Sequence, residues 1–170
     1  MTATQIKVLV LCTGNSARSI LGEALFNHLG QGRVRAYSAG SRPSGQVNPL
    51  ALETLAKHSV PLPAEVRSKS WDEFAVPGAP HFDYLFTVCA SAAGETCPVW
   101  LGHPVTAHWG IADPAHVEPI AARRAAFEQA FIALEKRIRA FLALDLAALS
   151  AQEVATAAQL IHVAAQEGEQ

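Results

Sequence analysis

The residues that point most directly to chemistry lie near the N-terminus, where five residues separate a cysteine from an arginine. The segment reads Cys12-Thr13-Gly14-Asn15-Ser16-Ala17-Arg18-Ser19 and is called the Cys12 loop below. A loop of this length before a helix can turn its backbone N–H groups toward one point, and the helix N-terminus adds a partial positive charge. The guanidinium of Arg18 can bind two oxygens of a tetrahedral anion. Residues 13–19 are therefore predicted to bind an oxyanion.

Cys12 is the predicted nucleophile at the centre of this loop. The positive electrostatic potential that attracts an anion to this loop also favours a thiolate. We therefore expect the pKa of the Cys12 thiol to fall below its usual value of about 8.5. Gly14 and Asn15 are expected to supply the positive φ angles that tight curvature needs. A simpler interpretation makes Cys12 a buried residue at a strand end and Arg18 a surface residue. The coincidence of cysteine, glycine, serine and arginine at this spacing favours the chemical interpretation.

Asp113 is the candidate acid. Displacement of an oxygen from a tetrahedral anion requires a proton for the leaving group, and a carboxylic acid can supply it. Pro114 follows directly and biases the backbone of Asp113 toward an extended conformation. An alternative is that Asp113 is a turn residue or caps the next helix. The neighbouring Trp109 is expected to pack rather than to catalyse.

The elements that must position these residues alternate between strands and helices. Apolar runs predict buried strands at residues 6–11, 34–38, 84–89 and 105–108, and helical patterns follow the Cys12 loop, Pro49, Ser70, Glu118 and the Ser150–Glu153 capping box. This alternation predicts an α/β fold, a three-layer sandwich with a central, mainly parallel four-stranded sheet flanked by helices. Cys12 and Cys89 each end a strand. They are expected to meet, because ligands of parallel sheets bind beyond the carboxyl ends of the strands.

Composition narrows the class of protein. The chain has 170 residues, half of them apolar, and a net charge of −2, which fits one buried core and disfavours nucleic-acid or membrane partners. The apolar stretch after Lys7 is too short for a secretion signal. Three cysteines, an odd number, argue against a static disulfide framework. We expect a cytoplasmic monomer, with residues 1–146 as the main domain and residues 147–170 as an additional C-terminal helix.

The Cys12 loop resembles the signature of the low-molecular-weight protein-tyrosine phosphatase superfamily, a cysteine followed after five residues by Arg-Ser or Arg-Thr. The resemblance extends over about residues 8–143 and includes Ser38-Ala39-Gly40-Ser41 and Asn48-Pro49. It implies the fold of that superfamily. It also implies that Cys12 is the nucleophile, that Arg18 binds the oxyanion and that Asp113 is an acid on a loop above the Cys12 loop.

Two further cysteines resemble the redox segment of the thiol-coupled arsenate reductases in this superfamily. Cys89 follows a predicted strand, and Cys97 precedes a proline after a linker of small residues. The resemblance implies arsenate as substrate, with phosphate or sulfate as analogues. It also implies a relay through Cys12, Cys89 and Cys97, with electrons from thioredoxin. One more residue separates Cys89 from Cys97 than in the best-known members, which leaves glutathione with glutaredoxin open as the reductant.

The resemblance implies no tightly bound cofactor and leaves potassium as an open option. Some relatives bind potassium near the nucleophile loop, and Asn15, Glu23 and Ser38 match three of the positions that hold it. The fourth, an aspartate, has no clear match near Trp71.

Three alternatives remain at this stage. A phosphatase needs only Cys12, Arg18 and Asp113, although Ala115 stands where phosphotyrosine-selective members often carry a tyrosine. A structural zinc site could use Cys89, Cys97, His103 and His108, although the short Cys-x-x-Cys pair typical of such sites is missing. A non-catalytic oxyanion-binding module is the third, and a nucleophile at the centre of the loop argues against it.

Overall fold

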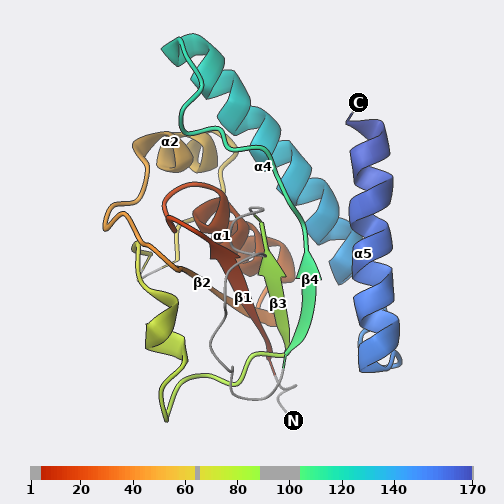
Figure 1. Cartoon of the computed structure of the whole chain (residues 1–170). Coiled ribbons are helices and arrows are strands. Elements are labelled where there is room, and N and C mark those ends of the chain that lie inside the picture. The colour runs from red at the N-terminus through yellow and green to blue at the C-terminus, as the bar shows by residue number, and fades with distance from the viewer. Residues whose placement is uncertain (1–4, 64–65, 89–103, 170) are drawn as a thin grey trace.

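The predicted alternation of strands and helices is confirmed in a computed structural model, which describes residues 5–63, 66–88 and 104–169 (Figure 1). The elements are β1 (Ile6–Cys12), α1 (Arg18–Gly30), β2 (Val34–Gly40), α2 (Pro49–Lys57), the 3-10 helix η1 (Trp71–Phe74), β3 (Tyr84–Thr87), β4 (Val105–His108), α4 (Ile120–Leu142) and α5 (Ala151–Gly168).

The four strands form one parallel sheet, as the sequence predicted, and the structure gives their order as β2-β1-β3-β4. The register aligns their carboxyl ends. Cys12 lies opposite Gly40, Leu11 lies opposite Thr87, and Thr87 lies opposite His108. Every loop that leaves these ends therefore starts at the same edge of the sheet, where ligands of such sheets bind.

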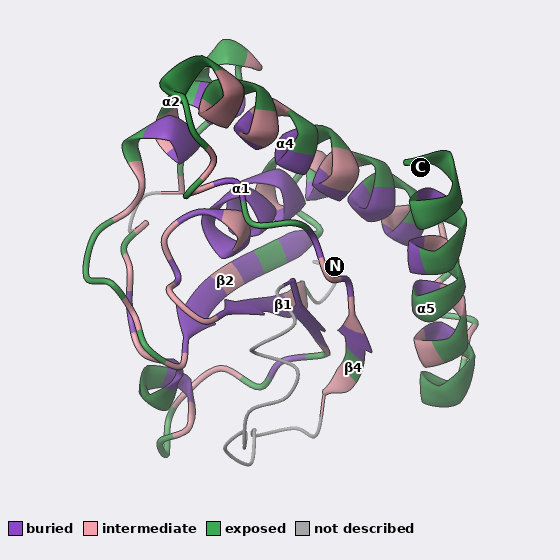
Figure 2. Cartoon of the chain, turned by 45° about the horizontal axis from the view of Figure 1, so that its top comes forward, coloured by how far each residue is buried: buried purple, intermediate pink, exposed green. Residues whose placement is uncertain are grey.

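Successive side chains of β1 point to opposite faces of the sheet, and so the core has two layers. Val8, Val10 and Cys12 point into the larger apolar cluster, which also contains buried residues of α1, α2 and α4. Leu9 and Leu11 point into a smaller cluster on the opposite face, built with η1 and the segment after it. Figure 2 shows the resulting pattern, with buried strands inside and helices exposed only on their outer sides. Cys12 thus faces α1, at the end of a fully packed strand.

The outer edge of β2 is paired by a side chain rather than by another strand. Asn27 of α1 accepts a hydrogen bond from the backbone N–H of Ala36 at 3.0 Å and donates one to its carbonyl oxygen at 3.1 Å. At the end of the strand, Gly40 forms an isolated parallel bridge with Ser70. These contacts satisfy backbone groups that an edge strand otherwise exposes.

The boundaries of several elements differ from the predictions. β2 continues to Gly40, two residues past its predicted end, and β3 ends at Thr87, while Cys89 falls outside the described residues. The helix predicted after Ser70 is a single 3-10 turn. The Ser70 hydroxyl accepts from the N–H of Asp72, and Glu73 instead pairs with Arg67 at 2.9 Å. The capping box of Ser150 and Glu153 is confirmed.

The last helix, α5, packs beside β4 and α4 (Figure 1). Its inner face is made of small and apolar residues, with Val154 and Ala158 both 1% exposed. An ion pair joins its C-terminal end to α4, since Arg137, 1% exposed, contacts the carboxylate of Glu169 at 2.7 and 2.9 Å. No helix among residues 5–63, 66–88 and 104–169 is long and apolar enough to cross a membrane.

Candidate active site

The Cys12 loop turns at Asn15, which has a φ of +44°. Its side chain donates to the hydroxyls of Ser19 at 2.8 Å and Ser38 at 3.0 Å, and its carbonyl oxygen accepts from the backbone N–H of Lys69 at 2.9 Å. These three bonds offset the cost of a left-handed conformation in a residue with a side chain. The expectation of a positive φ is confirmed for Asn15 and is wrong for Gly14, because one left-handed residue suffices for the turn.

A second segment holds the loop from outside. The carbonyl oxygens of Thr13, Gly14 and Ser16 accept from backbone N–H groups within residues 42–48, at 2.9 to 3.0 Å. Because the N–H and C=O of a planar peptide point in opposite directions, carbonyls bound outward leave N–H groups directed inward. The backbone of the loop therefore has the polarity that an anion requires.

Helix α1 begins directly after the loop without a side-chain cap. Its N-cap residue, Ala17, has no side chain that can bind the first N–H groups of the helix. Such groups need an external partner, and an anion is a suitable one. Cys12 is 5% exposed and ends β1, directly before this loop. The predicted oxyanion-binding residues 13–19 therefore follow the predicted nucleophile and lead into the N-terminus of α1.

Arg18 links the Cys12 loop to Asp113. One guanidinium nitrogen donates to the carbonyl oxygen of Ile111 at 2.8 Å, and another lies 3.7 Å from a carboxylate oxygen of Asp113. Residues 110–117, called the Asp113 loop below, therefore lie against the Cys12 loop. The other carboxylate oxygen of Asp113 accepts from the N–H of Ala115 at 2.9 Å. The structure thus brings Arg18 and Asp113 together, and Cys12 lies at the end of β1, where the loop that leads to Arg18 begins.

The other two predicted catalytic residues, Cys89 and Cys97, lie outside the described residues, as does His103 of the zinc alternative. The strand that leads to Cys89 does reach the site. The N–H of Val88, the residue before Cys89, donates to the carbonyl oxygen of Leu11 at 2.9 Å. For the part of the chain that is described, no group of three or more metal-ligating side chains is found. His108 instead has a ring nitrogen 2.7 Å from the hydroxyl of Thr87.

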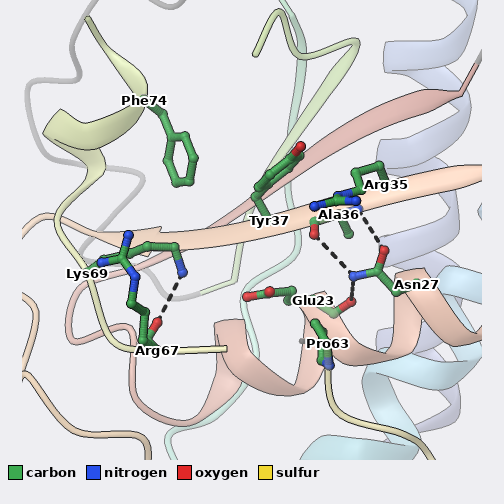
Figure 3. A pocket seen from close by; sticks show the side chains of 9 residues that line it. All are labelled: Glu23, Asn27, Arg35, Ala36, Tyr37, Pro63, Arg67, Lys69 and Phe74. Atoms are coloured by element: carbon green, nitrogen blue, oxygen red, sulfur yellow. Dashed lines mark hydrogen bonds between the residues drawn. The ribbon is translucent and has the colours of Figure 1, made fainter. Parts of the chain in front are cut away.

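Behind the Cys12 loop lies a cavity of about 490 Å³, shown in Figure 3. Glu23, which is 5% exposed, accepts a hydrogen bond from the Ser38 hydroxyl at its base. Three cationic side chains, Arg35, Arg67 and Lys69, line the same cavity. Burial raises the pKa of Glu23, although the Ser38 hydrogen bond and the three cations act against this. Burial also lowers the pKa of Lys69, which Glu23 partly offsets.

This raised pKa predicts a pH-dependent stability. Below pH 4.5 Glu23 is protonated in the folded and unfolded chains, and its contribution is fully present. As the pH rises through the pKa of the folded state, the buried carboxyl must ionise and that contribution is lost. We expect Glu23→Gln to reduce the loss of unfolding free energy between pH 4.5 and 8, measured by urea denaturation. Glu73→Gln is the matched control, because the Arg67 hydrogen bond lowers the pKa of Glu73. An equal pH slope for wild type and Glu23→Gln would contradict this account.

The same cluster does not fit a potassium ion well. Asn15 and Ser38 have the oxygen atoms expected of ligands, but the Asn15 oxygen already accepts from the Lys69 N–H, and the Ser38 oxygen already accepts from the Asn15 amide. Potassium, like other hard cations, needs several free oxygen ligands. The cations at this cavity, Lys69 among them, would also repel it.

Comparison with known proteins identifies the family of this chain. The family profile described as low molecular weight phosphotyrosine protein phosphatase matches residues 7–155. The chain belongs to that family. An arsenate reductase of Halalkalibacterium halodurans is 31% identical over 135 residues, which are 79% of this chain and 93% of the relative. The predicted resemblance to this superfamily is thereby confirmed.

Solved structures of the family agree with the fold. An arsenate reductase from Archaeoglobus fulgidus has a TM-score of 0.58 and 29% identity, and the match covers 78% of this chain and 98% of that one. A thioredoxin-dependent arsenate reductase from Corynebacterium glutamicum has a TM-score of 0.54 and 24% identity, with 82% of this chain and 64% of that one covered. The family match ends at residue 155, so most of α5 lies beyond it.

Sequence reasoning missed three contributors to the site. Gly40 lies against the backbone of the Cys12 loop, the carbonyl of Ile111 accepts from Arg18, and Lys69 joins the loop to the cavity. Gly40 lies in the segment that resembles the family, so its identity was a usable signal. A contact made by a backbone group, such as the Ile111 carbonyl, could not be predicted, because every residue type has that group.

Proposed function

We propose that this chain reduces arsenate to arsenite through a relay of three cysteines. The observation that carries the proposal is the placement of Arg18, which lies between the Cys12 loop and the carboxylate of Asp113. Arginine in that place can hold an oxyanion between a nucleophile and an acid. The names of the relatives supply the substrate, because the ones described above are arsenate reductases.

In the first step, the thiolate of Cys12 attacks arsenic in arsenate bound by the loop. One oxygen leaves as water after Asp113 donates a proton, so a sulfur–arsenic(V) bond replaces an arsenic–oxygen bond. The N–H groups of the loop and α1 bind the remaining oxygens. The carboxylate of Asp113 is 42% exposed, so solvent can return the proton.

In the second step, Cys89 attacks the sulfur of Cys12. The electron pair of the sulfur–arsenic bond passes to arsenic, which leaves as arsenite, and a Cys12–Cys89 disulfide forms. Cys97 then attacks Cys89, which frees Cys12 and leaves a Cys89–Cys97 disulfide. The β1–β3 pairing supports this sequence, because Val88 bonds to Leu11 and Cys89 is the next residue in the chain.

An external dithiol must reduce the final disulfide. We propose thioredoxin, which fits the description of the C. glutamicum relative as thioredoxin-dependent. A relay of reactive thiols also fits a reducing compartment such as the cytoplasm. Arsenate turnover in the presence of thioredoxin with its reductase, compared with glutathione and glutaredoxin, identifies the reductant.

Cys89→Ser tests the relay. This variant should lose arsenate turnover because no thiol can attack the Cys12 sulfur. It should still hydrolyse p-nitrophenyl phosphate, a reaction that needs only Cys12, Arg18 and Asp113. Mass mapping of trapped disulfides should show a Cys12–Cys89 bond in Cys97→Ser. Arsenate reduction by Cys89→Ser at the wild-type rate would rule out the relay.

A phosphatase is the second candidate, favoured by the family profile and by the groups that surround Cys12. Wild-type protein with phosphatase activity but no arsenate reduction under either reductant would select it.

We also propose that the reaction does not depend on potassium. Three cationic side chains already line the cavity at Glu23, the position where relatives that bind potassium would place it. Turnover should therefore be the same in potassium chloride and in choline chloride at equal ionic strength. A rate that rises more than about twofold with potassium, and saturates, would show that an ion binds there despite these charges.

A further inference from the structure

Helix α5 contacts the segment that leads into the Asp113 loop through one buried side chain. The indole N–H of Trp109 donates to the carbonyl oxygen of Ala158, in the middle of α5, at 2.9 Å. Trp109 is fully buried, and its ring lies 4.1 Å from that of Phe86, measured between centroids. Its ring is therefore fixed by the core, and its polar atom is fixed by α5.

A short path of hydrogen bonds runs from Trp109 to the site. The N–H of Trp109 donates to the carbonyl of Thr87 at 2.7 Å, and the N–H of Ile111 donates to the carbonyl of Val88 at 2.9 Å. The carbonyl of Ile111 accepts from Arg18, which also lies beside Asp113. Three residues thus separate Trp109 from Asp113, and their backbone is bound at both ends of the path.

One side of the Asp113 loop borders a cavity, although Ile111 itself is buried in the core. A cavity of about 650 Å³ lies between residues 110–114 and the C-terminal end of α5, where Gln166, Gly168 and Glu169 line it. A loop beside such a space can shift without displacing packed side chains. The loop is therefore held from its other side, by the backbone bonds of Trp109 and Ile111, by the Arg18–Ile111 bond and by the Trp109–Ala158 bond.

We propose that α5 holds the Asp113 loop in place through Trp109, which makes Trp109 a positioning residue for Asp113. This inference rests on the proposed role of Asp113 as the acid. It gives a function to a helix of which most lies beyond the family match. The ion pair of Arg137 with Glu169 holds the far end of α5 on α4, and so maintains the contact.

Trp109→Phe tests this proposal, because it retains an aromatic ring while it removes the N–H donor together with part of the indole ring. We expect kcat for arsenate to fall about tenfold, as for a small displacement of a catalytic group, while the Kd for phosphate stays within about twofold. Trp71→Phe is the matched control. It makes the same change in the apolar cluster on the opposite face of the sheet and should leave kcat unchanged.

A double-mutant cycle with Asp113→Asn separates positioning from a general loss of structure. If Trp109 acts through Asp113, Trp109→Phe should change kcat by less than about twofold in the Asp113→Asn background. A tenfold loss in both backgrounds, or no loss in the wild-type background, would overturn the proposal.

Amide hydrogen exchange provides a readout that does not depend on turnover. In Trp109→Phe, the N–H groups of Ile111 and Ala115 should exchange faster, whereas those of β1 should not change. If the wild-type protein does not reduce arsenate, the proposed function fails, and this measurement still decides whether α5 holds the loop. Unchanged exchange at Ile111 would show that it does not.

Discussion

Cys12→Ser should lower arsenate turnover by more than about a thousandfold, to the level of the buffer, because a serine hydroxyl at this position is not a nucleophile at neutral pH. The Cys12 loop is proposed to bind an anion. It contains no carboxylate or imidazole that could act as a base toward a serine hydroxyl. Initial rates of arsenite formation, with saturating reductant, measure the effect.

Binding should survive this substitution. The proposed oxyanion ligands are backbone N–H groups and the guanidinium of Arg18, none of which Cys12→Ser removes. Calorimetric titration with phosphate should therefore give a Kd within about threefold of the wild-type value. Loss of binding together with turnover would mean that the sulfur also shapes the loop, and the variant would then not isolate the nucleophile.

Gly40→Ala should distort the Cys12 loop, because Gly40 lies against the backbone of that loop. A Cβ atom at this position would press against the carbonyl oxygen of Thr13 and lie 2.8 Å from that of Cys12 and 3.0 Å from the N–H nitrogen of Asn15. All three are backbone atoms, and the Thr13 carbonyl is held by the N–H of Arg42, so they can yield only if the Cys12 loop moves. We expect the free energy of unfolding to fall by about 1–3 kcal/mol and kcat/KM to fall about a hundredfold.

Gly14→Ala is the control for the stability effect. Gly14 lies in the same loop, has no positive φ, and a Cβ added there meets no atom within 4 Å. The urea midpoint for unfolding of Gly14→Ala should therefore stay close to the wild-type value. Equal midpoints for the two alanine variants would contradict the clash at Gly40.

The fold was predictable because its signals are local. The apolar run of β1, the helix that follows it and the capping box at Ser150 each depend on neighbouring residues. Continuous apolar runs predict strands of a buried parallel sheet, and parallel pairing places the carboxyl ends of these strands at one edge. The proximity of Arg18 to Asp113 was predictable only through the family resemblance, because 95 residues separate them.

Contacts that depend on exact backbone positions could not be predicted. The left-handed residue of the loop is Asn15, and the choice between it and Gly14 is made by Ser19, Ser38 and Lys69, which come from three different elements or loops. The pairing of Arg137 with Glu169 is similar, since charges this far apart in the sequence carry no pattern. No sequence pattern marks His162 either, yet it accepts a buried hydrogen bond from Arg137 at 3.0 Å.

The contact between Asn27 and Ala36 has a consequence for how copies of this chain behave in a crowded solution. An uncovered outer strand is a template onto which another polypeptide can add, and fibrous aggregates grow in that way. Here an amide side chain occupies the donor and the acceptor of Ala36, while α5 lies beside the strand at the other end of the sheet. Asn27→Leu should consequently increase precipitation during refolding at high concentration, even if the variant folds normally when dilute.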